Sequence, residues 1–82
     1  MRFRSHALDE MSNDDLSPDD VINCILTGEI VEDQFDPWYQ QMKFVIWGDS
    51  HDGAEMGVVA RLDDYDNLIV ITVFRLIVSD YE

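Results

Sequence analysis

The sequence contains little that stabilises it covalently and nothing long enough to anchor it in a membrane. Cys24 is its only cysteine, which excludes an internal disulfide and a cysteine-rich zinc site. We expect Cys24 to pack on the apolar side of a helix rather than to act as a nucleophile. The N-terminus lacks an apolar signal-peptide core, and the longest apolar run, 68–78, is far below the ~20 residues that span a bilayer. We therefore expect a cytoplasmic protein.

Basic residues are also scarce. Five Lys and Arg stand against eighteen Asp and Glu, which gives a formal net charge of −13 spread along the chain. Affinity for DNA or RNA arises mainly from neutralising phosphates, so a chain this acidic repels a nucleic acid overall. Two interpretations of the acidity remain open. It keeps a small domain soluble or reflects a salty cytoplasm, or it forms a surface for a basic partner.

The chain is long enough for one domain, which we place at 1–82. A chain of this length buries only a little over ~60% of its unfolded surface, so its margin of stability is small. Hydrophobic residues make up 46% of the sequence, enough for one compact core. Docking to another chain would add stability, either in a homodimer or with a different protein.

Two helices are expected before residue 28. Residues 5–13 show a helical spacing of apolar positions. The second helix follows Ser17, which caps it, and Pro18, which suits the first helical position, while Gly28 ends it. Leu16 and Val21 are spaced as a hydrophobic staple. The buried stripe of this helix is predicted to consist of Val21, Ile22, Ile25 and Leu26.

After the helices the apolar period changes to two, which indicates strands at 29–35, 42–47, 54–62 and from 68 onward. The last strand is apolar on both faces, as is typical of a central strand. The sequence therefore predicts an α+β fold in which two N-terminal helices pack on a four-stranded antiparallel β-meander. Two short helices cover one face of such a sheet, so an exposed apolar second face would be an interaction surface.

The last hairpin contains a cluster of acidic residues. If its turn is centred on Tyr65, residue 55 pairs with residue 75, and Glu55 and Arg75 form a cross-strand ion pair. The turn residues lack the spacing and the glycine of a calcium-binding loop. They do suit the hydrogen bonds of the turn itself, so we expect no metal site there. This turn comprises Asp63, Asp64, Asp66 and Asn67.

Several segments together resemble a family of small prokaryotic domains of unknown function. They are "FRSHALDEM", "LSPDDVINCILTGEIVED", "FVIWG" and "VVARLDDYDNLIVITVF", of which the closing part, 68–74, is the most specific. Such domains look like relatives of the MqsR-, BrnT- and RelE-type toxins, which are ribonucleases paired with antitoxins. The resemblance implies a cytoplasmic prokaryotic or phage protein with a RelE/MqsR-like arrangement of helices on a sheet. Its implication of activity is weaker, because Glu10, Asp14 and Gly57 stand where that pattern often has two arginines and a histidine.

A ribonuclease of this kind needs an acid/base group and cations around the phosphate, but no metal. The candidates are His6 as acid/base and Arg4, Arg61 and Arg75 as phosphate contacts. The ion pair with Glu55 would remove Arg75 from this set. His6 also has a structural interpretation, as a helix-start residue packed against the sheet.

Binding to a protein is the alternative that the charge favours. Trp38 and Tyr39 follow Asp36-Pro37 in an expected loop, where they either cover the core or anchor a partner. Acidic residues of the helical region would attract a basic protein. The predicted partner-binding residues are Trp38, Tyr39, Asp14, Asp15, Asp19 and Asp20.

We therefore predict a small acidic protein-binding domain of the toxin-like family, without ribonuclease activity and without a cofactor. Its partner would be an antitoxin-like or basic protein. The alternatives are a ribonuclease toxin of a toxin–antitoxin pair, and a phage or mobile-element inhibitor that mimics nucleic acid.

Overall fold

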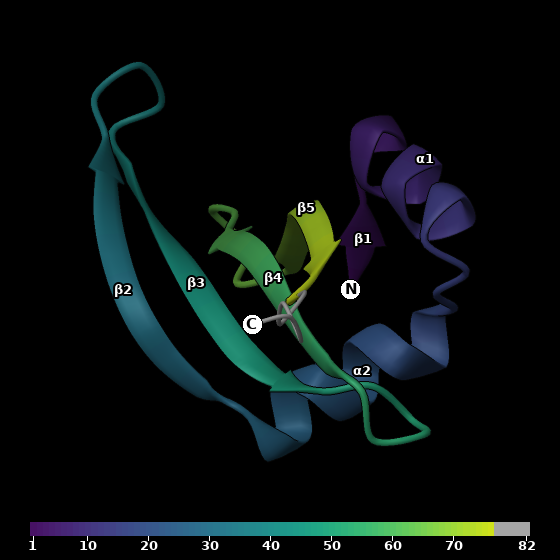
Figure 1. Ribbon diagram of the computed structural model, residues 1–82. Helices are drawn as coiled ribbons and strands as arrows, with labels where there is room; N and C mark the ends of the chain where they lie inside the picture. Colours follow the sequence, from purple (N-terminus) through teal and green to yellow (C-terminus); the bar gives the residue numbers. More distant parts are fainter. Residues whose placement is uncertain (77–82) are drawn as a thin grey trace, which may run out of the picture.

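The structure is a computed structural model of the chain that describes residues 1–76 (Figure 1). Within these residues, five strands form one sheet in the order β1-β5-β4-β3-β2, and two helices pack on it. The elements are β1 Arg2–Phe3, α1 Ser5–Asn13, α2 Pro18–Thr27, β2 Glu29–Asp36, β3 Gln41–Asp49, β4 Glu55–Leu62 and β5 Leu68–Arg75. Within the described residues, no helix is long and apolar enough to cross a membrane.

The predicted α+β fold is confirmed, with one additional strand. Strands β2 to β5 form the expected antiparallel meander. β1 adds to β5 in parallel, with Arg2 opposite Ile69 and Phe3 opposite Val70. Two residues are too few to show an alternating pattern, which is why β1 was not predicted. The last two residues of the predicted apolar run 68–78 lie outside the described residues.

Helix α2 begins with the cap that its sequence predicts. The backbone N–H of Asp20 donates to the Ser17 hydroxyl at 3.3 Å, and the N–H of Ser17 donates to the Asp20 carboxylate at 2.8 Å. The backbone N–H of His51 also donates to this carboxylate, at 2.8 Å. These two backbone donors lower the pKa of Asp20, with the larger effect from Ser17. Asp20 thus ties the start of α2 to the β3–β4 loop.

The buried stripe of α2 is narrower than predicted. Val21 and Cys24 are fully buried and Ile25 is partly buried against the core, whereas Ile22 is exposed and Leu26 is 78% exposed. Because α2 lies at the border of the fold and packs on the sheet alone, only one narrow side of it is covered. Cys24 is a packing residue, as predicted, and burial raises the pKa of its thiol to about 11.

The end of α2 packs directly on the backbone of β3. A Cβ atom added to Gly48 would lie 2.2 Å from the carbonyl oxygen of Cys24 and 2.9 Å from the Cα of Gly28. A Cβ on Gly28 would lie 2.2 Å from the carbonyl oxygen of Trp47. No side chain fits between the two elements, so these glycines set the position of α2 on the sheet.

Both helices lie on the same face of the sheet, as expected for two short helices (Figure 1). Their apolar residues pack on a layer of sheet residues that comprises Ile46, Met56, Val58, Ala60, Val70 and Val73. Directly paired residues of neighbouring strands share a face, so the register also defines the other side. This side, which we call the open face, includes Lys43, Val45, Trp47, Gly57, Val59, Arg61, Ile69, Thr72 and Phe74.

A register shift in β5 overturns the predicted Glu55–Arg75 ion pair. The hairpin is symmetrical about Tyr65 as far as the pair Ala60–Val70. The next pair is Val59–Thr72, so β5 carries one extra residue, and Arg75 lies opposite Met56. Arg75 therefore points to the helix side, where its Nε donates to the carbonyl oxygen of Asp14 at 2.8 Å.

Candidate functional site

The basic side chains of this acidic protein gather on the open face. Four of the five Lys and Arg residues line two neighbouring hollows there. The register places Arg2, Ile69, Arg61 and Lys43 in one row across β1, β5, β4 and β3. Arg4 follows on the same side as Arg2, because Phe3 between them packs against the core. The fold thus brings together, on the open face, basic residues that lie far apart in the sequence.

One of these hollows, which we call the basic hollow, brings cations together with an imidazole. Its volume is about 210 Å³. It forms where the start of α1 faces the β2–β3 hairpin across β4 and β5. Its lining consists of Arg4, His6, Asp36, Tyr39, Lys43, Arg61 and Ile71. Three of the five cations of the chain therefore share a concave site with His6.

Arg61 is held in place by the neighbouring hairpin. Its Nη1 donates to the side-chain oxygen of Gln41 at 2.9 Å. Its guanidinium carbon lies 5.5 Å from the centre of the Tyr39 ring, within the range of a cation–π interaction. A guanidinium fixed by two neighbours still presents free N–H groups, and it suits a phosphate oxygen.

Lys43 stands directly opposite Arg61 on the adjacent strand. Like charges in this position repel and destabilise the strand pair. The Lys43 ammonium lies 3.4 Å from the Asp36 carboxylate, which offsets part of this repulsion. An anion bound between the two cations would remove the remainder.

His6 is oriented by a carboxylate rather than packed against the sheet. Its Nε2 lies 3.3 Å from Oε2 of Glu10, and its side chain is 70% exposed. The other oxygen of Glu10 accepts the backbone N–H of Val73 at 3.0 Å, on the part of β5 that β1 does not cover. Glu10 therefore orients the imidazole through Nε2, and Nδ1 stays available to contact a ligand.

The chain matches the model of one known protein family over most of its length. Residues 3–75 match DUF4258, described as a domain of unknown function. The chain belongs to the DUF4258 family. No curated protein and no solved structure matches it. The resemblance to a small domain of unknown function is thereby confirmed, and the relation to ribonuclease toxins stays a prediction. The match covers all of the residues that line the basic hollow of this DUF4258 domain.

The predicted ribonuclease residues are only partly brought together in this DUF4258 domain. His6, Arg4 and Arg61 line the basic hollow, whereas Arg75 binds carbonyl oxygens of the α1–α2 connection on the other face. Lys43 takes the place that the sequence analysis gave to Arg75. Lys43 lies at the same height as Arg61 in the sheet, a relation visible only once the register of β3 and β4 is known.

The predicted partner-binding residues lie in two separate places. Trp38 and Tyr39 are in the turn at the tip of the β2–β3 hairpin, where the Asp36 carboxylate accepts the N–H of Trp38 at 2.9 Å. Trp38 is 91% exposed and does not cover the core. Asp14, Asp15, Asp19 and Asp20 lie at the α1–α2 connection and the start of α2, on the other side of the molecule (Figure 1).

The acidic β4–β5 turn uses its side chains for its own hydrogen bonds, as predicted. The Asp63 carboxylate accepts the N–H of Tyr65 at 2.8 Å and the N–H of Asn67 at 2.9 Å. These donors, with the larger effect from Asn67, lower the pKa of Asp63. Within residues 1–76, no group of three His, Cys, Asp or Glu residues is placed to hold a metal ion.

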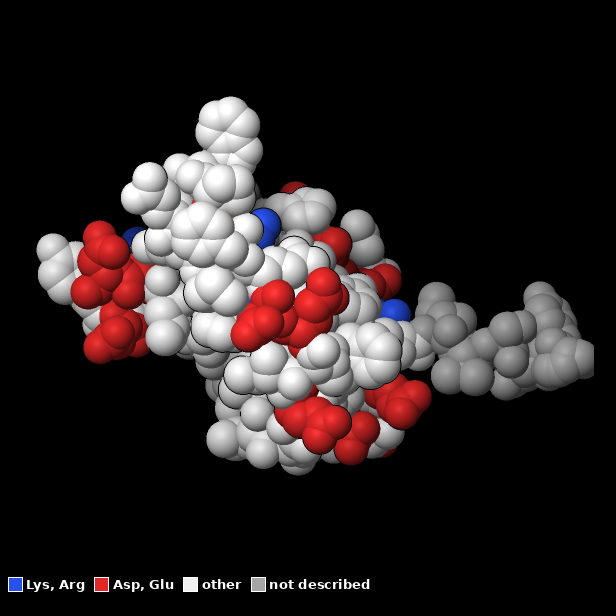
Figure 2. All heavy atoms as spheres, turned by 90° about the vertical axis from the view of Figure 1, so that its left-hand side faces the viewer, with Lys and Arg blue, Asp and Glu red and all other residues white. Residues whose placement is uncertain are grey.

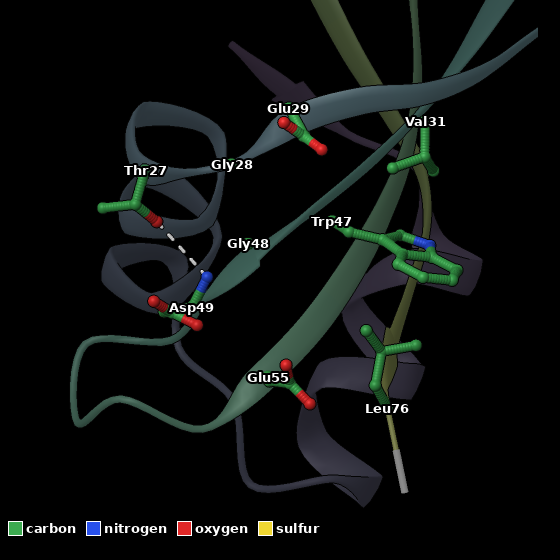
Figure 3. Close-up of a pocket in the computed structure, with 9 residues that line it drawn as sticks. All are labelled: Thr27, Gly28, Glu29, Val31, Trp47, Gly48, Asp49, Glu55 and Leu76. Atoms are coloured by element: carbon green, nitrogen blue, oxygen red, sulfur yellow. Dashed lines mark hydrogen bonds between the residues drawn. The ribbon is translucent and has the colours of Figure 1, made fainter. Parts of the chain in front are cut away.

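A further hollow lies at the opposite end of the open face (Figure 3). Its volume is about 290 Å³, and the N–H of Asp49 at its rim donates to the Thr27 hydroxyl at 3.2 Å. Figure 3 shows the carboxylates of Glu29, Asp49 and Glu55 and the half-exposed Trp47 ring among its lining side chains. The lining residues include Glu29, Val31, Trp47, Asp49, Glu55 and Leu76. The open face is therefore basic at one end, apolar in the middle and acidic at the other end.

Proposed function

We propose that this domain binds single-stranded RNA at the basic hollow and cleaves it without a metal ion. One observation carries the proposal: in a chain of net charge −13, three of five cations line one hollow with an exposed histidine. The predicted resemblance to ribonuclease toxins agrees with this reading. The alternative of the sequence analysis thus becomes the function that the geometry supports best.

The hollow contains the groups that RNA cleavage requires. Nδ1 of His6 accepts the proton of a ribose 2′-hydroxyl, and the 2′-oxygen attacks the adjacent phosphorus. Arg61 and Lys43 stabilise the negative charge that develops on the phosphate oxygens. The bond from phosphorus to the 5′-oxygen breaks, and the Tyr39 hydroxyl donates a proton to that oxygen. The products are a 2′,3′-cyclic phosphate and a 5′-hydroxyl.

The overall charge opposes this function but does not prevent it. Exposed charges are largely screened beyond a Debye length of about 8 Å at physiological ionic strength. A phosphate in the hollow lies within direct contact of Arg4, Lys43 and Arg61, whereas many carboxylates lie on other surfaces. We therefore expect short, accessible RNA segments to bind better than long duplexes.

Replacing Arg61 with Gln is expected to weaken binding of a short single-stranded RNA by roughly tenfold to a hundredfold, because a hydrogen bond to a charged group contributes about 1.5–3 kcal/mol. The plot of log affinity against log salt concentration becomes shallower by about 0.7, the value for one phosphate contact on a single strand. Fluorescence anisotropy at several salt concentrations measures both quantities, and EDTA is present throughout.

The matched control is Arg75→Gln, which removes the same charge from the opposite face. It is expected to lower stability, because Arg75 holds the α1–α2 connection, but to leave the salt dependence unchanged wherever the protein is folded. Equal effects of the two variants on RNA affinity would contradict the proposal, because they would indicate a response to net charge alone.

A second candidate function is protein binding without RNA cleavage, as the sequence analysis predicted. It is supported by the side chain of Trp38, which is 91% exposed at the tip of the β2–β3 hairpin. A fully exposed tryptophan contributes little to folding, whereas tryptophan is among the residues that dominate binding energy at interfaces. Asp20 is a poor candidate for such contacts, because its carboxylate already accepts two backbone N–H groups.

Under this function, Trp38→Ala is expected to weaken the complex with a captured partner by about 2 kcal/mol or more, roughly thirtyfold. The partner is purified by affinity capture on the native domain and its affinity for each variant is measured by calorimetry. Tyr65→Ala is the control, since Tyr65 is 87% exposed in the turn of another hairpin. Equal affinity of the native protein and Trp38→Ala would contradict this function.

A further inference from the structure

The two edges of the sheet differ in how far their backbone groups are covered against pairing with a further strand. At one edge, β1 covers the first part of β5, and the Glu10 carboxylate accepts the N–H of Val73 farther along. At the other edge, β2 pairs with β3 on one side, and no strand within residues 1–76 lies on its other side (Figure 1). Such an edge presents backbone N–H and C=O groups that another strand can pair with.

β2 is long and exposed for an edge strand. Seven of its eight residues are exposed. Ile30 and Phe35, on the helix side of the sheet, are 60% and 58% exposed, because the helices do not reach this strand. Apolar side chains beside free backbone groups are what a strand-adding partner would cover.

The charge of β2 restricts what this partner can be. Glu29, Glu32 and Asp36 project on the open face, and Asp33 projects on the helix side. Figure 2 looks onto this side of the molecule and shows several acidic clusters among uncharged residues, with few basic atoms. A second copy of β2 would place carboxylates opposite carboxylates, which is unfavourable. A strand that carries cations meets no such repulsion.

We propose that β2 accepts an extended basic segment of a partner protein as an additional strand of the sheet. A register shift between Ile30 and Glu32 puts Glu29 and Glu32 on the same face of β2, together with Asp36. Because side chains of the added strand alternate between faces, that segment carries Lys or Arg at every second position, opposite these three carboxylates. The positions between them are apolar and cover Ile30 and Phe35. This site is separate from the basic hollow, so the proposal goes beyond RNA binding and does not depend on it.

The proposal is tested with the full chain and a synthetic peptide of alternating Lys and Val. Hydrogen exchange measured by mass spectrometry is expected to slow in residues 29–36 when the peptide is added, and to change little in α1 and α2. A peptide of the same composition, with all Lys before all Val, is expected to protect residues 29–36 at least tenfold less at equal concentration. Each peptide has the same charge, so the difference reports strand pairing.

The matched variants separate pairing from general attraction. Glu29→Lys with Glu32→Lys is expected to weaken binding of the alternating peptide at least tenfold. Asp9→Lys with Asp64→Lys changes the net charge equally at exposed positions outside β2 and is expected to weaken it far less. Equal losses in both double variants, or no protection of residues 29–36, would overturn the proposal. So would sedimentation that shows a dimer of the native chain, provided Glu29→Lys with Glu32→Lys disrupts it, because the occupant would then be a second copy.

Discussion

Replacing His6 with alanine is expected to slow RNA cleavage by about 10²- to 10⁴-fold, the usual contribution of a general acid or base. His6 is the only imidazole that lines the basic hollow, and its side chain is 70% exposed, so its loss removes the base without opening the core. The rate is measured under single-turnover conditions with a labelled RNA in the presence of EDTA, and the cyclic phosphate product is identified by mass spectrometry.

His51→Ala is the matched control, because the β3–β4 loop uses only the backbone N–H of His51. This variant is expected to cleave RNA at the native rate. Glu10→Gln is expected to give an intermediate rate, since it weakens the contact that orients His6. Cleavage by His6→Ala at the rate of the native protein would exclude the proposed chemistry and would point to a contaminating nuclease. Absence of cleavage by the native protein would favour the protein-binding function.

Replacing Gly48 with alanine is expected to destabilise the domain by about 3 kcal/mol or more, at the upper end of the cost of overpacking. The new methyl group would lie 2.2 Å from the carbonyl oxygen of Cys24, which is backbone and cannot rotate away. α2 must therefore shift on the sheet, and the buried contacts of Val21 and Cys24 are lost in part. Urea denaturation followed by circular dichroism and by tryptophan fluorescence measures the free energy of unfolding.

Gly53→Ala provides the comparison for this variant. Gly53 has φ of 91°, and a Cβ atom added to it would have no neighbour within 4 Å. Gly53→Ala is therefore expected to lower the free energy of unfolding only by the strain of a left-handed backbone, about 1–2 kcal/mol. If Gly48→Ala were as stable as Gly53→Ala, the contact between α2 and β3 would not be the close backbone packing described above.

The positions of the basic side chains distinguish RNA binding from protein binding better than the net charge of the chain does. A net charge of −13 is a sum over the chain, and it led the sequence analysis to favour a protein partner. The sheet register then placed Arg61 directly opposite Lys43 and in line with Arg2. A local concentration of cations is compatible with strong overall acidity, because direct contacts act over shorter distances than the screening length.

Features that depend on neighbouring residues were predictable from the sequence. The Ser17 cap of α2, the end of α2 at Gly28 and the self-bonded turn at Asp63 each involve groups within a few positions of one another. Strands β2 to β5 were predictable for a similar reason, since alternation of apolar residues is a local signal. His6, Arg4 and Arg61 were identified as candidates from residue type and resemblance.

The tertiary structure alone decided how distant segments meet. The extra residue in β5 moved Arg75 to the helix side, and no residue type in that apolar strand marks the shift. The pairing of β1 with β5 closed one edge of the sheet and brought Arg4 and His6 to the hollow, while Lys43 joined them from β3. Caps, turns and alternation are fixed by bonds between near neighbours, whereas register and edge pairing depend on contacts between residues far apart in the chain. The sequence by itself therefore determined the two helices and strands β2 to β5, and only the folded sheet determined the pairing of β1 and which side chains share a site.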